Sequence, residues 1–408
     1  MPYMKSVAVV FGIGVGSRYE KKENNGISHL IEHMLFKGTK KRKSSLEISQ
    51  AIEGVGGEIN AATSKEVTQI YARIPQEKFK IALEVIADIL LNSLFREADL
   101  EKEKLIIIEE IKKYEDLPEE LVELLLDKVI WGNHPLGRTI LGEERIISRL
   151  QRVDLLSFLS QFYQPNNLVV SVAGNIKTKE VVTQIRRYFQ EVKEGKIREY
   201  LPARINQQTI RFETKFKRSN QAHLAFGFPG ISRLDYRRYS LDLLDIILGS
   251  GLSSRLFQEI RMKKSLAYDI HSYIQYFNDT GSFNIYAGVE ASRLGEALQA
   301  VIEELKRIKE NKVPEEELKK AKEMYKGALS LSLESTLSRA FWWGNRILFY
   351  GEPITFEEVK ERIEEVKKED IQSLAQHIFT SDRINLSLIG PFKKTTLEED
   401  QAILQELS

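Results

Sequence analysis

The sequence repeats itself once, and this duplication constrains the fold more than any other feature. Three pairs of segments match in the same order: FGIGVGS at 11–17 with FGFPGIS at 226–232, WGN at 131–133 with WGN at 343–345, and LVVSVAG at 168–174 with INLSLIG at 384–390. A period of this length is too long for a solenoid repeat and fits a duplicated globular domain. Similar strands within one large domain would explain the shared order and offset less well.

Both copies are expected to contain the same elements in the same order. Each opens with an apolar strand, continues with helices, a strand pair and long amphipathic helices, and closes with a strand. The expected helix Glu77–Leu91 carries Phe79, Leu83, Ile86 and Leu90 at helical spacing. This order predicts an α+β fold with helices covering one face of a mostly antiparallel sheet. The expected strands are Val7–Phe11, Gly57–Thr63, Thr68–Ile74, His223–Phe228, Ser265–Tyr276 and Gly281–Gly288.

The expected domains follow from the chain length and one polar stretch. A chain of 408 residues suits two domains. The stretch Gly195–Gln208 is polar, contains Pro202 and is the best candidate for a linker. The polar tail after Phe392 is expected to be partly disordered. We therefore expect a first domain at residues 1–195, a linker at 196–204 and a second domain at 205–408.

Composition and charge exclude several classes of function. There is no cysteine, which rules out disulfides, thiolate metal sites and a cysteine nucleophile. Lys and Arg number 60 against 59 Asp and Glu, and this near-zero net charge gives no argument for a nucleic acid or an anionic membrane as partner. No secretory signal and no long apolar run are recognisable, so a cytoplasmic protein without a membrane span is expected.

The first copy carries a metal-site motif, NGISHLIEHMLF at residues 25–36. The segment is expected to be helical, with Asn or Ser at its start. Residues four apart share one helical face, so His29 and His33 can both reach one ion. Two imidazoles at this spacing suit zinc, and Glu32 suits a general base acting on zinc-activated water. H-x-x-E-H is the inverted metalloprotease motif, and two unrelated histidines are the alternative.

A third ligand is expected from the acidic and aliphatic run at residues 103–111, because a catalytic zinc needs three protein ligands and an open position. A carboxylate among aliphatic residues is costly unless it is paired or bound to a metal. Glu103 and Glu110 lie two helical turns apart on one face, while Glu109 points about 100° away from Glu110. Spacing alone does not choose between Glu109 and Glu110. A solvated acidic face without a metal is the alternative.

These motifs resemble the pitrilysin/insulinase superfamily of zinc peptidases, and the resemblance covers nearly the whole chain. GGEINAATSKEVTQIYA at 56–72 and HPLGRTILG at 134–142 are similar to further family segments. The nearest relatives resemble a two-domain bacterial processing-protease branch, similar to the mitochondrial processing peptidase β subunit. The resemblance implies two homologous α+β domains of the LuxS/metalloprotease-like kind.

The resemblance implies roles for residues of the first copy. His29, His33 and Glu110 would hold one zinc ion per chain. Glu32 would be the catalytic base. Glu103 would support the metal ligands without binding the zinc itself.

Substrate contacts are also implied. Phe36 matches the family position that contacts the residue after the cleaved bond. The strand around Gly57–Thr63, with Asn60 and Ala61, is expected to offer an open edge to which an extended peptide adds by backbone hydrogen bonds.

The acids that bind a substrate arginine in processing-peptidase relatives are matched only in part. Glu120 stands at the first position, but Leu124 occupies the second, with Glu123 beside it. The resemblance therefore implies Glu120 as a substrate contact without implying a preference for arginine.

The second copy lacks H-x-x-E-H, since the aligned stretch at 240–248 reads SLDLLDIIL. It cannot build the same metal site. It does contain RMKKSLAY at 261–268, in which Arg261 and Tyr268 match a family pair that binds substrate and stabilises the tetrahedral intermediate. A cation and a phenol can both donate to a developing oxyanion. Without the resemblance, a surface charge and a core aromatic would be the simpler interpretation.

The sequence therefore predicts a zinc metalloendopeptidase that hydrolyses peptides or extended, unfolded segments. One alternative is a non-hydrolytic scaffold or peptide-binding subunit of a processing-peptidase-like complex. A weaker one is a metal-binding protein without peptidase activity. The four-domain relatives place the zinc helix in the first domain and the arginine–tyrosine pair in the fourth. This two-domain chain is therefore expected to act as a homodimer whose active sites are completed by the partner chain.

Overall fold

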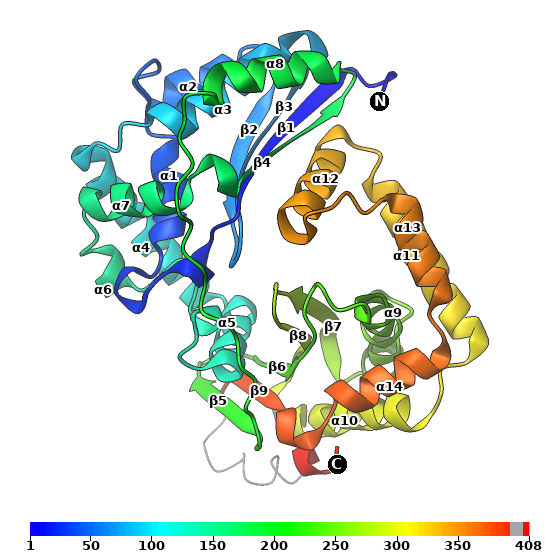
Figure 1. Ribbon diagram of the computed structural model, residues 1–408. Coiled ribbons are helices and arrows are strands. Elements are labelled where there is room, and N and C mark those ends of the chain that lie inside the picture. The colour runs from blue at the N-terminus through cyan, green and yellow to red at the C-terminus, as the bar shows by residue number, and fades with distance from the viewer. Residues whose placement is uncertain (392–402, 408) are drawn as a thin grey trace. The chain divides into compact units, whose positions relative to one another are not determined.

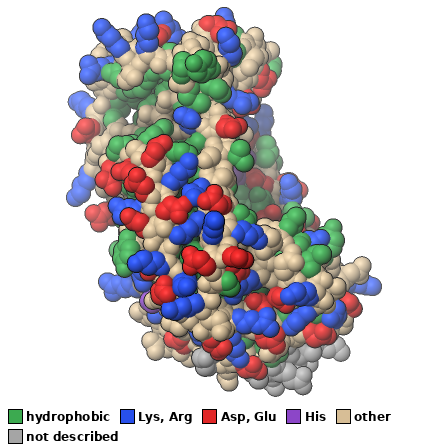
Figure 2. All heavy atoms as spheres, turned by 90° about the vertical axis from the view of Figure 1, so that its right-hand side faces the viewer, with side chains coloured by type: hydrophobic (Ala, Val, Ile, Leu, Met, Phe, Trp, Pro, Cys, Tyr) green, Lys and Arg blue, Asp and Glu red, His purple; other side chains and the backbone are tan. Residues whose placement is uncertain are grey.

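The computed structural model describes residues 1–391 and 403–407, which form two compact units (Figure 1). The expectation for the tail after Phe392 falls largely outside these residues. Within them, no helix is long and apolar enough to cross a membrane. Acidic and basic side chains are interspersed over the face shown in Figure 2. The first unit comprises residues 1–112, 138–201 and 330–353, and the second comprises 113–137, 202–329 and 354–408.

A four-stranded antiparallel sheet forms the centre of the first unit, with the strand order β2-β3-β1-β4. β1 is buried on both faces, which is why its sequence is a continuous apolar run rather than an alternating one. β2 lies at an edge of the sheet. The strands are β1 (Ser6–Ile13), β2 (Glu58–Thr63), β3 (Thr68–Pro75) and β4 (Leu168–Gly174), and the predicted strands of this copy are confirmed.

Helices bury one face of this sheet in the main core of the unit, where Phe11, Leu30, Ile86 and Phe158 pack together. The metal-motif segment forms α1, as predicted, and the acidic run lies in α4. The helices are α1 (Ile27–Leu35), α2 (Ser45–Glu53), α3 (Phe79–Asn92), α4 (Glu97–Asp116), α6 (Glu144–Ile147), α7 (Arg152–Phe162) and α8 (Thr178–Phe189).

The opposite face of the sheet is covered by α12 (Thr336–Tyr350), which comes from the second half of the chain. Ala340 packs against Ala8, Val10 and Ala173. A Cβ on Gly344 would lie 3.2 Å from the Ser171 side chain, so the small residue permits a close approach of helix and sheet. The first unit therefore contains a helix that is distant from it in sequence.

The second unit is built around a five-stranded sheet with the order β5-β9-β6-β8-β7. β5 pairs with β9 in parallel, and the other pairs are antiparallel. The predicted strands of this copy are confirmed, while β5 was not anticipated. The strands are β5 (Arg211–Phe216), β6 (Gln221–Pro229), β7 (Ala267–Tyr276), β8 (Gly281–Glu290) and β9 (Asn385–Gly390).

One face of the second sheet is covered by α5 (Pro118–Trp131), which comes from the first half of the chain. Leu126 and Ile130 pack against Ala225 and Ile389. Gly227 is required here, because an added Cβ would lie 2.5 Å from the Ile130 side chain. The other helices of this unit are α9 (Arg238–Leu248), α10 (Leu294–Glu310), α11 (Glu315–Ser332), α13 (Phe356–Glu365) and α14 (Lys368–Ile378).

The two halves of the sequence thus exchange one helix each. The first WGN repeat stands at the end of α5 and the second lies within α12, which pairs the two helices in sequence, and each helix completes the unit formed mainly by the other half of the chain. The boundaries 1–195 and 205–408 remain a prediction about the duplicated sequence. The compact units differ from these boundaries at the two exchanged helices, since residues 113–137 belong to the second unit and residues 330–353 to the first. Sequence matching pairs the repeated segments but does not show which sheet each helix covers.

Candidate metal centre

The N-terminus of α1 is held by a buried carboxylate. Glu20 Oε2 accepts hydrogen bonds from the backbone N–H of Gly26 and from Asn25 Nδ2, both at 2.8 Å, and its Oε1 accepts one from Ser28 N at 2.9 Å. These donors are among the groups that a helix start leaves without partners. Burial raises the pKa of Glu20, and the N–H donors partly offset this. The helix start differs from the prediction, since Gly26 at φ +95° is the N-cap and no Asn or Ser side chain caps it.

A loop after α5 fixes the same helix end. Arg138 donates to the backbone oxygen of Glu20, and Asn25 Nδ2 also donates to the backbone oxygen of Thr139. The backbones of Gly26 and Gly142 touch, since a Cβ on either glycine would lie 2.9 Å from the Cα of the other. This contact explains the two glycines and locates the first turn of α1, which contains His29.

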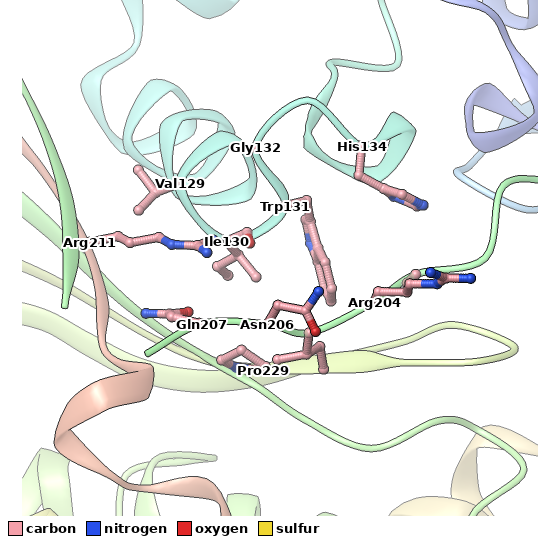
Figure 3. A pocket seen from close by; sticks show the side chains of 12 residues that line it. Val129, Ile130, Trp131, Gly132, His134, Arg204, Asn206, Gln207, Arg211 and Pro229 are labelled. Atoms are coloured by element: carbon pink, nitrogen blue, oxygen red, sulfur yellow. Dashed lines mark hydrogen bonds between the residues drawn. The ribbon is translucent and has the colours of Figure 1, made fainter. Parts of the chain in front are cut away.

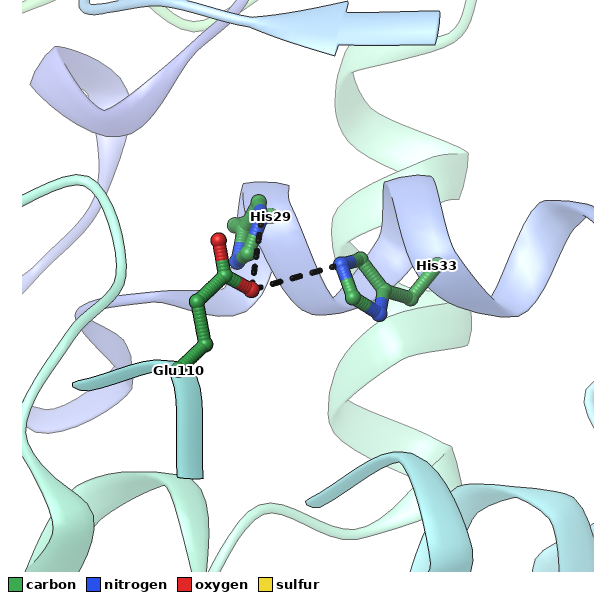
Figure 4. A group of neighbouring side chains, drawn as sticks. All are labelled: His29, His33 and Glu110. Atoms are coloured by element: carbon green, nitrogen blue, oxygen red, sulfur yellow. Dashed lines mark ion pairs between the residues drawn. The ribbon is translucent and has the colours of Figure 1, made fainter. Parts of the chain in front are cut away.

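Three side chains converge beside α1 (Figure 4). Glu110 Oε2 lies 3.9 Å from His29 Nε2 and 3.8 Å from His33 Nε2. Both histidines come from α1 and the glutamate from α4, and each offers one ligand atom within 4.8 Å of the others. The Glu109 side chain is 73% exposed and pairs with Lys112. The geometry therefore favours Glu110 over Glu109, a choice that spacing had left open.

The two histidines have different surroundings. Burial and the nearby His33 lower the pKa of His29 to about 4, so His29 is neutral and able to bind a metal at neutral pH. His33 Nδ1 lies 3.1 Å from Glu103 Oε2, and Lys37 Nζ pairs with the other oxygen of Glu103 at 2.8 Å. Burial works to raise the pKa of Glu103, but its bonds to His33 and Lys37 lower it overall. Glu103 thus contacts Nδ1 of His33, while Nε2 of the same ring lies near Glu110. A carboxylate on the other ring nitrogen is the usual partner of a metal-binding histidine.

Glu32 lies next to the candidate metal ligands and is suited to proton transfer. Burial raises the pKa of Glu32, and the charge of Glu110 raises it further. Thr63 and His33 lower the pKa of Glu32 and so oppose this shift. The Thr63 hydroxyl makes no hydrogen bond of good geometry to any described residue. Glu32 Oε2 is likewise buried and without a partner among the described residues. A buried carboxylate of raised pKa is suited to accept and then return a proton.

The residues present fit a zinc ion. Ligand atoms about 2.0–2.1 Å from a tetrahedral zinc lie about 3.3 Å apart. The distances of 3.8 and 3.9 Å from Glu110 to the two histidines would contract by about half an ångström to match. Two neutral nitrogens and one carboxylate form the donor set of many catalytic zinc sites, with the fourth position open to water or substrate. His33 has the carboxylate partner that such a ligand normally has, whereas His29 Nδ1 has none among the described residues.

The predicted open edge is confirmed, because β2 is an edge strand that packs beside α1. Asn60 is exposed and Ala61 is half-buried. Asn60 Oδ1 accepts a hydrogen bond from the backbone N–H of Ala61 at 2.8 Å. An added peptide strand would therefore compete with this side chain. Phe36 is half-buried directly after the last residue of α1.

The other predicted site residues belong to the second unit. Arg261 lies in a π-helical segment, with its guanidinium carbon 5.3 Å from the centre of the Tyr268 ring, and both residues line one cavity. Tyr268 is 74% exposed, so it is not the core aromatic of the simpler interpretation. Glu120 lies on α5. Burial, and then the charge of Glu120, raise the pKa of the neighbouring Glu123 to about 7.

Sequence reasoning missed Glu20 and Lys37. Glu20 stands in the charged stretch YEKKENN, where nothing sets it apart except its position shortly before the start of α1. Lys37 follows His33 by four residues, a spacing that would share one helical face, although α1 already ends at Leu35. That spacing was the available signal for Lys37.

The fold and this site define a class of protein: a duplicated α+β chain with an H-x-x-E-H motif and a candidate metal centre in one of its two copies. Residues 1–144 match the family model described as "Insulinase (Peptidase family M16)", and residues 149–325 match "Peptidase M16 inactive domain". The chain belongs to the M16 peptidase family.

Relatives and solved structures agree with this assignment. An uncharacterised zinc protease of Bacillus subtilis is 39% identical over 96% of this chain and 94% of its own length. A second one, from Streptomyces coelicolor, is 37% identical over 96% of this chain and 86% of its own length. The crystal structure of a protease from Helicobacter pylori has a TM-score of 0.90 at 24% identity and covers 95% of both chains. This structural similarity shows the fold alone.

Proposed function

We propose that this protein is a zinc metalloendopeptidase that cleaves peptides or extended, unfolded segments. The observation that carries the proposal is the convergence of His29, His33 and Glu110 beside the buried Glu32. The names of its relatives support zinc and proteolysis at the level of the family.

His29, His33 and Glu110 would hold the ion. When bound, zinc acidifies water and polarises a carbonyl oxygen. Glu32 takes a proton from the attacking water and returns it to the leaving amine, which its raised pKa favours. Glu103 keeps His33 oriented through the bond to Nδ1.

An extended segment would bind along β2. Its backbone would pair with the open edge after displacing Asn60 from the Ala61 N–H, which gives binding that tolerates many sequences. Phe36 favours an apolar or aromatic residue after the cleaved bond. A cleavage profile that is indifferent at that position, or efficient cleavage of tightly folded proteins, would contradict this substrate model.

We further propose a homodimer in which Arg261 and Tyr268 of one chain serve the metal centre of its partner. The proposal rests on the resemblance to four-domain relatives, and it is supported by the pairing of the half-buried Arg261 with the exposed Tyr268 in the second unit. A Glu32→Gln chain and a Tyr268→Phe chain should each be inactive. Mixed dimers would contain one site with both defects and one with neither, so activity should return. No recovery despite demonstrated subunit exchange would reject the shared site.

The decisive test combines metal analysis with a quenched-fluorescent peptide assay. We expect one zinc equivalent per chain, and hydrolysis that a chelator abolishes and zinc restores. Zinc without hydrolysis of any extended peptide would favour the non-hydrolytic scaffold. Two tightly bound equivalents per chain would contradict a site confined to the first copy.

A further inference from the structure

A second cavity lies in the second unit, at the C-terminal end of α5, and has a volume of about 420 Å³ (Figure 3). It falls within the range of about 300–1,000 Å³ that is usual for small-molecule sites. Its walls are the C-terminal end of α5 with the residues that follow it, the segment 203–207, the start of β5 at Arg211 and the end of β6 at Pro229. Neither the metal residues nor the Arg261–Tyr268 pair lines it.

Trp131, one of the residues that line this cavity, carries an unused hydrogen-bond donor. Trp131 is 8% exposed, and its indole Nε1 is buried without a partner among the described residues. The ring packs edge-on against Phe277 with centres 5.9 Å apart, which fixes the direction of the N–H group. A buried N–H without a partner destabilises the folded protein, and an acceptor in the cavity would remove this cost.

The charges around the cavity favour an anion. No Asp or Glu is among its twelve lining residues, whereas Arg204 and Arg211 are. Arg211 Nη1 donates to the backbone oxygen of Ile130, which offsets the partial negative charge at the end of α5 and leaves other guanidinium N–H groups available. The nearby Asp279 is engaged by the backbone N–H of Ala203.

The remaining wall is apolar. Figure 3 shows Ile130 and Pro229 near the middle of the cavity, between Arg211 on one side and Trp131 on the other. Arg204 lies beyond Trp131. A ligand that filled this space would therefore contact donors at its polar end and aliphatic carbons along its body.

We propose that this cavity binds a small organic anion. Its oxyanion accepts hydrogen bonds from the Trp131 indole and from Arg211, and its short apolar body lies against Ile130 and Pro229. Carboxylates and phosphate monoesters share this chemistry. The proposal does not depend on the peptidase function, because none of these residues belongs to that machinery.

Isothermal titration calorimetry with benzoate, phenyl phosphate and neutral benzamide tests the proposal. We expect saturable binding of at least one of the two anions and none of benzamide, and the preferred anion identifies the source of the oxyanion. Trp131→Phe keeps an aromatic ring and removes the N–H, so affinity should fall about tenfold or more. Trp343→Phe, the same change in the other WGN repeat, is the matched control and should leave affinity unchanged.

Three outcomes would overturn the site: no saturable binding of either anion, equal binding of benzamide, or equal affinity in the Trp131→Phe protein. Inorganic phosphate binding as tightly as phenyl phosphate would overturn the apolar half of the proposal. If Trp131→Phe unfolds in a thermal melt, Arg204→Gln provides the second variant. It removes a cation at the exposed rim and should weaken anion binding severalfold.

Discussion

Helices α1 and α9 follow the opening strands of their copies, yet they use their polar side chains in different ways. On α1, His29 and His33 face Glu110 on another helix, and one ligand atom of each lies within 4.8 Å of the others. On α9, Asp242 accepts a hydrogen bond from Tyr276 and Asp245 accepts one from Ser272.

The ends of the two helices differ as well. Glu20 holds the N-terminus of α1, whereas Arg237 at the start of α9 provides no side-chain cap. The same structural position can therefore serve a metal centre or internal packing. The role of the helix depends on its polar side chains. Where neighbouring elements supply hydrogen-bond partners, these side chains contribute to packing; where they converge with a third ligand residue, they can hold a metal.

The comparison predicts its largest effect at Glu32. Glu32→Gln should lower turnover about 10²–10⁴-fold, the usual contribution of a general base, while zinc stays bound. Asp245→Asn makes the same kind of change on α9 and should leave peptide cleavage at its original rate. Peptide kinetics with metal analysis of both variants check this. A Glu32→Gln protein that retained full turnover would remove Glu32 from the mechanism.

The next effect concerns the two adjacent glutamates of α4. Glu110→Gln should weaken zinc binding more than about 100-fold, because even outer partners of ligands contribute about 10–100-fold. Glu109→Gln is the control and should keep its zinc, since Glu109 faces solvent and Lys112. Competition with a fluorescent chelator measures both affinities. Zinc loss in the Glu109 variant alone would reverse the assignment.

A smaller effect is expected at the end of α1. Glu20→Gln places an amide N–H₂ among backbone donors that need an acceptor, so the first turn should shift. We expect zinc affinity to fall by about tenfold. Thr355→Ala removes the cap of α13 and should cost about 1 kcal/mol of stability with zinc affinity unchanged. A changed absorption spectrum of the cobalt-substituted Glu20→Gln protein would show altered ligand geometry. An unchanged spectrum and affinity would reduce Glu20 to a stabilising contact.

The smallest expected effect is a pH dependence of stability that Asp245 on α9 causes. Burial raises the pKa of Asp245 to about 7, with Asp242 adding to the shift. Between about pH 4 and about pH 7, the folded state holds a proton on Asp245 that the unfolded state has released. The stability that the protonated Asp245 contributes at low pH is therefore lost as the pH rises from about 4 to about 7. Asp245→Asn mimics the protonated form and should be more stable than the parent at pH 8 and equal to it near pH 4. Urea unfolding at both pH values measures the difference. A parallel pH dependence in both proteins would contradict the raised pKa.

Sequence patterns predicted the strands and the histidine pair because periodicity and i, i+4 spacing act within a single element. Glu110 could not be separated from Glu109 in this way, since the choice depends on how α4 rotates against α1. Glu20 was missed because two of its partners are the backbone N–H groups of Gly26 and Ser28, which leave no trace in residue identity. The exchange of α5 and α12 is likewise a property of packing, as both helices have apolar faces that either sheet could accept.

The exchanged helix also sets an order of events during synthesis. The strands of the first sheet are complete once β4 has been made, but α12 begins only at Thr336, 162 residues after Gly174. At about 5–20 residues per second, translation of that interval takes on the order of ten to thirty seconds. During this time the face of β1 and β4 that carries Ala8, Val10 and Ala173 has no α12 to cover it. The nascent chain thus presents an apolar sheet face that a chaperone can protect, and release from that protection would coincide with the emergence of the last fifth of the protein.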